Sequence, residues 1–218
     1  SSGQTKAYNS DSFPAAALLD SGSSLTYLPD PVVEELYTDF EVTYIPSSGV
    51  GVVPCALARE DIHMNFTFSE PTISVPMDEM VLDVGAGTFE DGTPACVLGI
   101  SPAGDGSIVL GDTFLRSAYV VYDLENNEIS LAQTRFNSSD DNILEITKGP
   151  SGVPKATQVK GAVTSAIGAA DGGARIGGPT GTGSLPSAST DLAAHAAPTM
   201  NLMQYAAGAA GVGLLLTL

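Results

Sequence analysis

Near its N-terminus the chain reads Leu18-Leu19-Asp20-Ser21-Gly22-Ser23-Ser24, and this stretch says more about the fold than any other. The apolar run 15–19 ends at Asp20, and small hydroxyl residues surround the glycine that follows. A short apolar run predicts a buried strand, and Asp-Ser-Gly predicts a tight turn at its end. A carboxylate in a turn rich in N–H and O–H donors can stay ionised in acid. Asp20 is therefore a candidate catalytic acid.

A second informative block lies in residues 107–123. Ser107-Ile108-Val109-Leu110-Gly111-Asp112 predicts a short aliphatic strand that ends at a glycine, and the strand-like Ala118-Tyr119-Val120-Val121-Tyr122-Asp123 follows. Asp-Ser-Gly alone is a common turn. Together, however, the two blocks resemble the pepsin-like aspartic proteases. The first resembles their Asp-Thr/Ser-Gly-Thr/Ser signature, and the second resembles their ILGD-x-FLR-x-x-Y-x-V-Y/F-D pattern.

The resemblance implies an all-β fold. It would be the single C-terminal lobe of the two-lobe pepsin-like acid protease fold, with short helices and a disordered tail. Asp20 would be one of two catalytic aspartates that share a proton. No second Asp-Thr/Ser-Gly occurs in the sequence. The partner aspartate is therefore expected from an N-terminal lobe of the same precursor, and the chain alone is expected to be inactive.

The resemblance also implies roles for the residues around Asp20. Ser21 is expected to form a hydrogen bond across the interface between the lobes. Gly22 is expected to place a backbone N–H near the carboxylate, and Ser23 to donate to its outer oxygen. Gly111 is expected to let its strand pass close beside the aspartate loop.

The activity implied is that of an endopeptidase acting on protein and peptide substrates, through a water activated by the aspartate pair. No cofactor and no metal are expected. Three alternatives remain. One is a homodimeric protease that takes one Asp20 from each copy. Another is an anchored, non-catalytic cell-wall protein with an inherited protease lobe, and the third is a structural secreted β domain.

The chain has two cysteines, Cys55 and Cys96. Neither belongs to a CxxC pair, and only His63 and His195 could assist, which argues against a zinc site. An even count with wide spacing suits one disulfide in an oxidising compartment, the alternative being two buried free thiols. Pepsin-like C-terminal lobes carry a disulfide in this region, so the resemblance favours the bond.

Charge is distributed unevenly along the chain. The whole chain has a formal net charge of −17, and every acidic residue except Asp171 and Asp191 lies within residues 1–147. So acidic a surface repels nucleic acid and anionic membranes, which excludes both as expected partners.

Alternating and apolar runs predict a β-rich domain. One helix is predicted over residues 30–39, with Asp30 as N-cap and Pro31 at the first helical position. Strands are predicted at 15–19, 41–46, 51–57, 64–68, 72–75, 79–82, 96–100, 107–111, 118–123 and 128–132.

Composition divides the chain into three parts: a lobe over residues 1–136, a Ser/Thr/Gly/Pro-rich disordered stalk over 137–200, and a hydrophobic end over 201–218. The stalk has too few apolar residues to offset its chain entropy. The end resembles a GPI-attachment signal, the alternatives being a weak transmembrane helix or a buried segment. With this end, the chain most resembles the fungal yapsin-type cell-surface proteases.

Secretion is expected on several grounds. Asn65-Phe66-Thr67 and Asn137-Ser138-Ser139 are N-glycosylation sequons. A disulfide and a lipid anchor both require the secretory pathway, so an extracellular, membrane-anchored or cell-wall location is expected. The chain begins at Ser1 without a signal peptide, and an N-terminal part is therefore expected to be missing.

Overall fold

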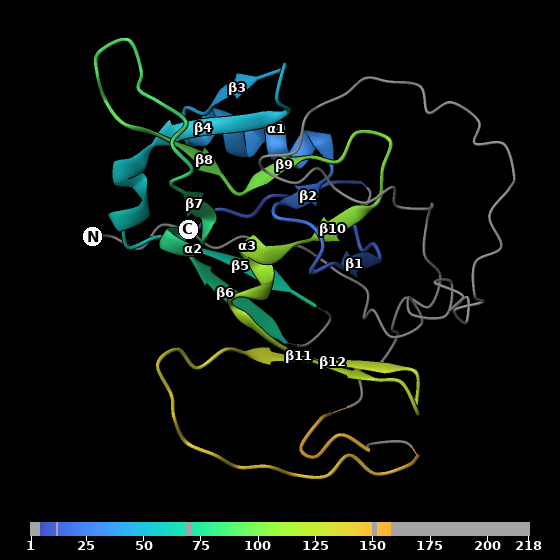
Figure 1. Ribbon diagram of the computed structural model, residues 1–218. Helices are drawn as coiled ribbons and strands as arrows, with labels where there is room; N and C mark the ends of the chain where they lie inside the picture. The colour runs from blue at the N-terminus through green and yellow to red at the C-terminus, as the bar shows by residue number, and fades with distance from the viewer. Residues whose placement is uncertain (1–4, 12, 69–70, 150–151, 158–218) are drawn as a thin grey trace, which may run out of the picture.

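The computed structural model describes residues 5–11, 13–68, 71–149 and 152–157, and everything below concerns these residues (Figure 1). They form mostly short strands with a few short helices. The predicted all-β fold class is confirmed. Within these residues no helix is long and apolar enough to cross a membrane. The predicted tail 201–218 and most of the predicted stalk lie outside the described residues.

The sheet that positions the candidate acid has four strands in the order β1-β10-β2-β9. They are β1 (Ala17–Leu19), β10 (Ile108–Leu110), β2 (Thr26–Leu28) and β9 (Ile100–Pro102). β1 and β10 are parallel, with Leu19 opposite Leu110, although 88 or more residues separate them in sequence. The two sequence blocks around Asp20 and Gly111 therefore meet at one end of this sheet.

β1 is less buried than its apolar sequence predicts. It is the edge strand of its sheet, and the side chain of Leu18 is 37% exposed. An edge strand has a neighbour on one side only, so its outward side chains lack the cover that a central strand receives.

A second four-stranded sheet has the order β3-β4-β8-β7. Its strands are β3 (Thr43–Ile45), β4 (Val50–Pro54), β8 (Ala95–Leu98) and β7 (Val81–Leu82). Cys55, directly after β4, forms a disulfide with Cys96 in β8, with an S–S distance of 1.99 Å. Because β4 and β8 are already paired through Val53 and Cys96, the disulfide staples neighbouring strands of one sheet.

Two hairpins complete the strands: β5 (His63–Thr67) with β6 (Thr72–Pro76), and β11 (Ala118–Asp123) with β12 (Glu128–Gln133). The side chain of Gln133 joins them. Its Oε1 accepts from the Ser74 N–H at 2.7 Å, and its Nε2 donates to the Ser74 carbonyl at 2.9 Å. The amide of Gln133 thus bonds to the backbone N–H and carbonyl of Ser74 in β6, as a neighbouring strand would.

The helices are α1 (Asp30–Asp39), α2 (Met77–Met80), α3 (Asp112–Leu115) and the 3₁₀ helix η1 (Cys55–Arg59). α1 has the predicted bounds, but Asp30 is not its N-cap. Pro29 occupies that position and Asp30 is the first helical residue. The carboxylate of Asp30 instead accepts from the Gly104 N–H at 2.8 Å, so a tertiary contact replaces the local cap.

Other predictions of secondary structure also differ from the structure. The predicted strand 96–100 is divided at Gly99 between β8 and β9. β2 was not predicted, because its three residues, Thr26–Leu28, are too few to show a pattern. The predicted strands 51–57 and 79–82 each include a helical turn, in η1 and α2 respectively. In both cases the apolar residues pack into the core from a turn, and their spacing over four or five residues does not separate helix from strand.

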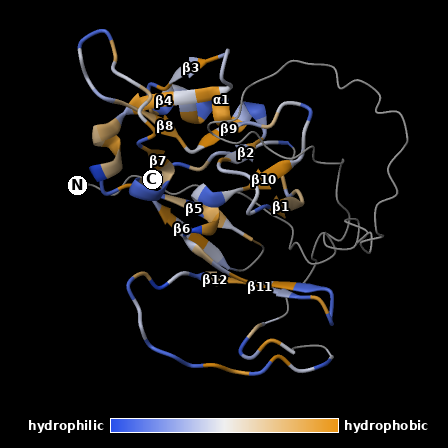
Figure 2. Ribbon diagram, in the orientation of Figure 1, coloured by the Kyte–Doolittle hydropathy of each residue, from blue (hydrophilic) through white to orange (hydrophobic). Residues whose placement is uncertain are grey.

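The core lies between the sheets, α1 and the β5–β6 hairpin. Its largest fully buried side chains include Leu36, Phe66, Met80, Ile100 and Phe114. The rings of Phe66 and Phe114 meet edge to face at 5.1 Å, which ties the β5–β6 hairpin to α3. In Figure 2 many hydrophobic residues lie in strands and in parts of α1, and the long loop below the β11–β12 hairpin also carries hydrophobic stretches.

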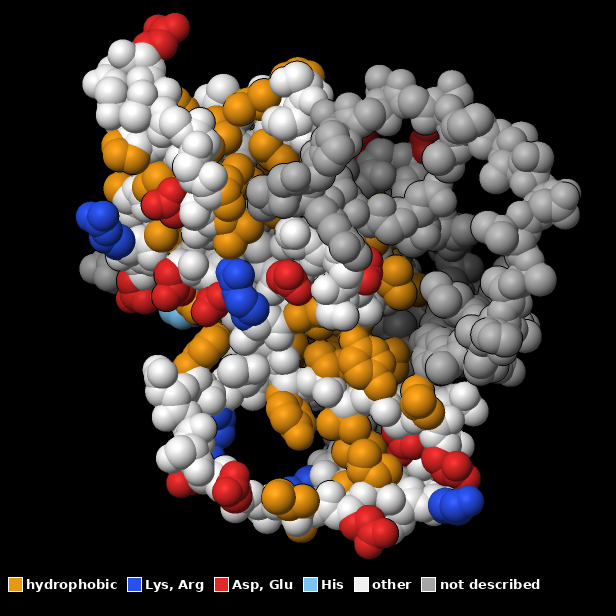
Figure 3. All heavy atoms as spheres, in the orientation of Figure 1, with side chains coloured by type: hydrophobic (Ala, Val, Ile, Leu, Met, Phe, Trp, Pro, Cys, Tyr) orange, Lys and Arg blue, Asp and Glu red, His pale blue; other side chains and the backbone are white. Residues whose placement is uncertain are grey.

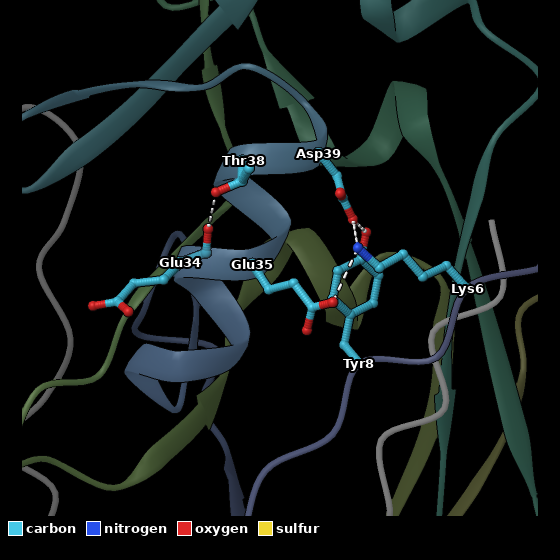
Figure 4. Close-up of polar contacts among 6 residues, drawn as sticks. All are labelled: Lys6, Tyr8, Glu34, Glu35, Thr38 and Asp39. Atoms are coloured by element: carbon cyan, nitrogen blue, oxygen red, sulfur yellow. Dashed lines mark hydrogen bonds and ion pairs between the residues drawn. The ribbon is translucent and has the colours of Figure 1, made fainter.

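The N-terminal segment is fixed to α1 by a polar cluster (Figure 4). Tyr8 is buried, and its hydroxyl donates to Asp39 at 2.6 Å. The Lys6 ammonium pairs with Glu35 at 3.0 Å and with Asp39. These two donors lower the pKa of Asp39, Lys6 having the larger effect. The segment that precedes β1 therefore follows a defined path across the helix.

Candidate active site

Asp20 stands at the carboxyl end of β1, where the strand gives way to the turn. Its backbone N–H donates to the Leu110 carbonyl at 3.1 Å and extends the β1–β10 pairing by one bond. Its carbonyl accepts from the Ser23 N–H at 3.2 Å, which closes the turn. The position of Asp20 is thus set by one bond to a distant strand and one bond within its own turn.

Both carboxylate oxygens of Asp20 are held by donors from that turn. The Gly22 N–H donates to Oδ1 at 2.8 Å, and the Ser23 hydroxyl donates to Oδ2 at 2.7 Å. The side chain of Ser23 is buried, whereas Asp20 is partly exposed and Ser21 is exposed. These two hydrogen bonds, one from an N–H and one from an O–H, fix the plane of the carboxylate.

Gly111 brings the second block against this turn. A Cβ atom at this position would lie 2.2 Å from the Leu25 carbonyl oxygen and 2.5 Å from the Ser23 carbonyl oxygen. The Asp112 N–H also donates to Ser23 at 2.8 Å. Only a residue without a side chain permits so close an approach of two backbones.

Behind the turn, a layer of buried hydroxyl groups joins the strands. Thr26 and Thr113 place their hydroxyl oxygens 3.1 Å apart, and Thr113 donates to the Gly99 carbonyl at 2.8 Å. A Cβ at Gly99 would meet the Thr113 methyl group at 2.4 Å. Sequence reasoning missed this layer; its one visible signal was a glycine directly after an apolar strand.

Tyr122 of β11 is a side chain from outside the turn that lies close enough to Asp20 to feel its charge. Its hydroxyl lies 3.5 Å from the Leu19 carbonyl, at the limit of a hydrogen bond. Burial and the negative charge of Asp20 raise the pKa of Tyr122. The phenol is neutral in acid, and its hydroxyl is oriented toward the backbone of the residue before Asp20. Its sequence signal was the aromatic position before Asp123.

The other predicted sites lie elsewhere. Asn65 is half-buried in β5 opposite Ser74, and Asn137 is exposed in a turn after β12 with a φ of 54°. Glycosylation of both stays a prediction. Among the described residues, no group of three or more His, Cys, Asp or Glu side chains is arranged to hold a metal.

Comparison with known proteins places these features in a family. Residues 2–134 match the model of the eukaryotic aspartyl protease family, and the chain belongs to that family. The described strands and short helices accordingly form the all-β architecture of a pepsin-like lobe.

Relatives with recorded names agree. The chain is 59% identical over 205 residues to a probable aspartic-type endopeptidase, opsB, of Aspergillus fumigatus, a match that covers 93% of this chain and 42% of that protein. It is 40% identical over 141 residues to the aspartic proteinase yapsin-3 of Saccharomyces cerevisiae, which covers 64% of this chain and 26% of the relative. The chain thus spans less than half the length of these relatives.

Proposed function

We propose that this chain supplies one of the two catalytic aspartates of an aspartic-type endopeptidase. The observation that carries the proposal is the pair of hydrogen bonds that orients the Asp20 carboxylate. Its donors are the Gly22 N–H and the Ser23 hydroxyl, and the carboxylate lies at a partly exposed strand end. The names of the relatives support the same class of reaction. The protein would hydrolyse peptide bonds in protein substrates and use no cofactor.

In the proposed mechanism a water molecule lies between Asp20 and a second carboxylate. One carboxylate, ionised, accepts a proton from the water as the water oxygen attacks the scissile carbonyl carbon. The other, protonated, donates to the carbonyl oxygen. Proton transfer to the amide nitrogen then releases the amine and leaves a carboxylic acid. Two carboxylates in contact cannot both ionise easily, so the pair titrates as a unit.

The surrounding residues would hold the reacting carboxylate in place. Gly22 and Ser23 fix its plane, so it does not rotate away from the water. Gly111 keeps the turn pressed against β10. Ser21, which is exposed, is proposed to donate to the facing turn of the second lobe.

The second aspartate is proposed to come from an N-terminal lobe of the same precursor. The relatives are more than twice as long as the matched region, which leaves room for such a lobe. The exposed side chains of Leu18 and Tyr122 flank Asp20 with apolar surface that the lobe would cover. The chain alone is therefore proposed to be inactive.

We also propose that the protein is secreted and held at the cell surface. The Cys55–Cys96 disulfide fits an oxidising compartment. The sequons at Asn65 and Asn137 and the resemblance of residues 201–218 to a GPI signal agree with that location. Treatment of intact cells with a phosphatidylinositol-specific phospholipase is expected to release the protein. Retention of a mature form that still ends at Leu218 would contradict the anchor.

The central test is Asp20→Asn in the full-length protein, with peptide cleavage measured between pH 3 and 6. The expected result is a loss of about 10³-fold or more in kcat, because the water loses its proton acceptor. Asp105→Asn, in an exposed loop, is the matched control and should retain full activity. Near-normal turnover by the Asp20 variant would overturn the proposal. Activity of a dimer of the 218-residue chain would instead favour the one-motif homodimer.

A further inference from the structure

Two threonines close to the Asp20 turn are completely buried. Thr26 begins β2 and Thr113 lies in α3, and neither has any exposed surface. The surface beside the turn is different: Figure 3 shows apolar side chains exposed over β1 and β11, where Leu18 and Tyr122 are 37% and 45% exposed. The threonines therefore cannot touch a substrate, and any effect they have on the reaction must pass through the turn.

The direction of the hydrogen bonds between these threonines follows from their protons. A hydroxyl has one proton to donate and two lone pairs with which to accept. Thr113 donates its proton to the Gly99 carbonyl at 2.8 Å. The bond between the Thr26 and Thr113 oxygens, which lie 3.1 Å apart, is then donated by Thr26. The bonds form a chain from Thr26 through Thr113 to Gly99, in which each bond strengthens the next.

The Gly99 carbonyl is the point at which two segments near the site meet. It accepts from the Thr113 hydroxyl and also from the Thr26 backbone N–H, at 2.9 Å. Gly99 is itself fixed, because its N–H donates to the Met80 carbonyl at 2.6 Å. A Cβ at Gly99 would lie 2.4 Å from the Thr113 methyl group and 2.8 Å from the Met80 carbonyl oxygen. So close a contact holds the Thr113 side chain against this carbonyl.

Both segments lead from the Gly99 carbonyl to Ser23. Thr26 lies three residues after Ser23 in the chain. Asp112, the neighbour of Thr113, donates its N–H to the Ser23 carbonyl at 2.8 Å. The Ser23 hydroxyl in turn donates to Oδ2 of Asp20 at 2.7 Å. A shift of Thr113 would therefore pass through Asp112 and Ser23 to the carboxylate.

We propose that the Thr113 hydroxyl is a positioning group for Asp20. It keeps the segment of Gly111 and Asp112 in a fixed place relative to β2, so that Ser23 presents its hydroxyl to Oδ2 in one orientation. The inference rests on the proposed function, because it gives Thr113 a part in the reaction of Asp20. Small displacements of a reacting group are costly, and a shift of about 1 Å can reduce turnover by about 100-fold.

Thr113→Val in the full-length protein tests the inference, because valine has nearly the shape of threonine and no hydroxyl. At a temperature well below unfolding, kcat for peptide cleavage should fall by about 10-fold or more. KM should change by less than about twofold, since Thr113 is buried away from the substrate. Thr113→Ser keeps the hydroxyl and should restore most of the lost kcat. An unchanged kcat in the folded valine variant, or equal kcat values for the valine and serine variants, would overturn the proposal.

Two controls separate positioning from stability. Thr67 and Thr72 form a similar hydroxyl pair, 3.0 Å apart, in the β5–β6 hairpin, and Thr72→Val should leave kcat unchanged. Ile73→Val removes one methyl group from a fully buried side chain and should lower the Tm without lowering kcat. A loss of kcat in either control as large as that in Thr113→Val would overturn the proposal, because general loosening of the lobe would then explain it.

The direction of the chain gives a measurement of stability that does not involve activity. Thr113→Val leaves the Thr26 hydroxyl without the acceptor it uses, whereas Thr26→Val leaves the bond from Thr113 to Gly99 in place. The Tm should therefore fall further for Thr113→Val, by at least about 2 °C. The double variant should be no less stable than Thr113→Val alone. A larger fall for Thr26→Val would overturn the central place of Thr113 in the chain.

The outcome is separable from that of the proposed function. Hydrogen exchange of the Asp112 N–H reports its bond to Ser23 whether or not the protein is an enzyme, and Thr113→Val should speed this exchange by about 10-fold or more. If Asp20→Asn remains active while this exchange is faster, the catalytic assignment fails and the hold of Thr113 on the turn stands. If activity depends on Asp20 but Thr113→Val changes neither kcat nor this exchange, only the positioning role fails.

Discussion

Asp20 and Asp123 are held in nearly the same way and yet differ in what they can do. Asp20 follows β1 and Asp123 is the last residue of β11, and each carboxylate accepts one bond from a backbone N–H and one from a side chain of the adjoining turn. For Asp20 the donors are Gly22 and Ser23, and for Asp123 both donors belong to Asn126. However, Asp123 is only 4% exposed, whereas Asp20 is partly open to solvent.

The difference lies in what surrounds each turn. The chain after β12 returns to the turn after Asp123, where Asn126 bonds to Thr147 and Gly149, so the bonds of Asp123 help to hold that returning segment. The Asp20 turn is bonded to β10, and it leaves Asp20 partly exposed and Ser21 exposed. Hydrogen bonds that orient a carboxylate therefore do not by themselves mark a catalytic acid; access for water and substrate is also required.

Replacing each acid by its amide in the full-length protein tests whether Asp20 is catalytic and Asp123 structural. Asp20→Asn should lower kcat by about 10³-fold or more and change the Tm little. Asp123→Asn should leave kcat near normal and lower the Tm by about 5 °C, because the new amide group faces the donors of Asn126. Steady-state kinetics and calorimetry measure the two effects, and a catalytic defect in the Asp123 variant would contradict the assignment.

Gly111→Ala should disturb the Asp20 turn through its backbone. The added Cβ would meet carbonyl oxygens of Leu25 and Ser23, so the strand or the turn must move. A loss of about 3 kcal/mol in the free energy of unfolding is expected, together with reduced activity. Gly85→Ala is the control: it has a φ of 72° but open space, and should cost only about 1 kcal/mol. Denaturant unfolding compares the two, and equal losses would refute the close-packing argument.

Asn126→Ala tests the other turn without changing any charge. The variant removes the side-chain donor to Asp123 and the two bonds to Thr147 and Gly149, so a loss of about 2 kcal/mol in the free energy of unfolding is expected. Protease sensitivity between residues 135 and 149 should rise at the same time. Glu125→Gln, which removes only the exposed ion pair with Lys148, is the control and should change neither.

The smallest effect is a pH dependence. Asn126 lowers the pKa of Asp123, and Lys6 and Tyr8 lower that of Asp39. A lowered folded-state pKa contributes stability above the unfolded pKa of about 4, and that contribution is lost as pH falls through the folded value. Unfolding midpoints should therefore decrease below about pH 4. Asp123→Asn should flatten this decrease, and an unchanged slope would contradict the role of Asp123.

Local patterns were enough to predict the candidate turn and most of the strands. The resemblance to the pepsin-like family implied Gly22 and Ser23 as donors to Asp20, and both donate to its carboxylate in the structure. The helix 30–39 was predicted to the residue, since its apolar face repeats over three turns. The elements missed were short, and a run of two to five residues holds too little periodicity to identify.

The sequence by itself determined the Asp20 turn, the glycine at position 111 and the helix α1, because each depends on neighbours a few positions away or on the steric limits of one residue. Tertiary structure alone decided the rest. It paired β1 with β10 and bonded the Asp30 carboxylate to the Gly104 N–H in place of a helix cap. It also bonded Asn126 to Gly149, in a segment that composition had assigned to a stalk. These contacts join residues between 21 and 91 positions apart, and such pairings are chosen by the packing of the whole core, which no local pattern encodes.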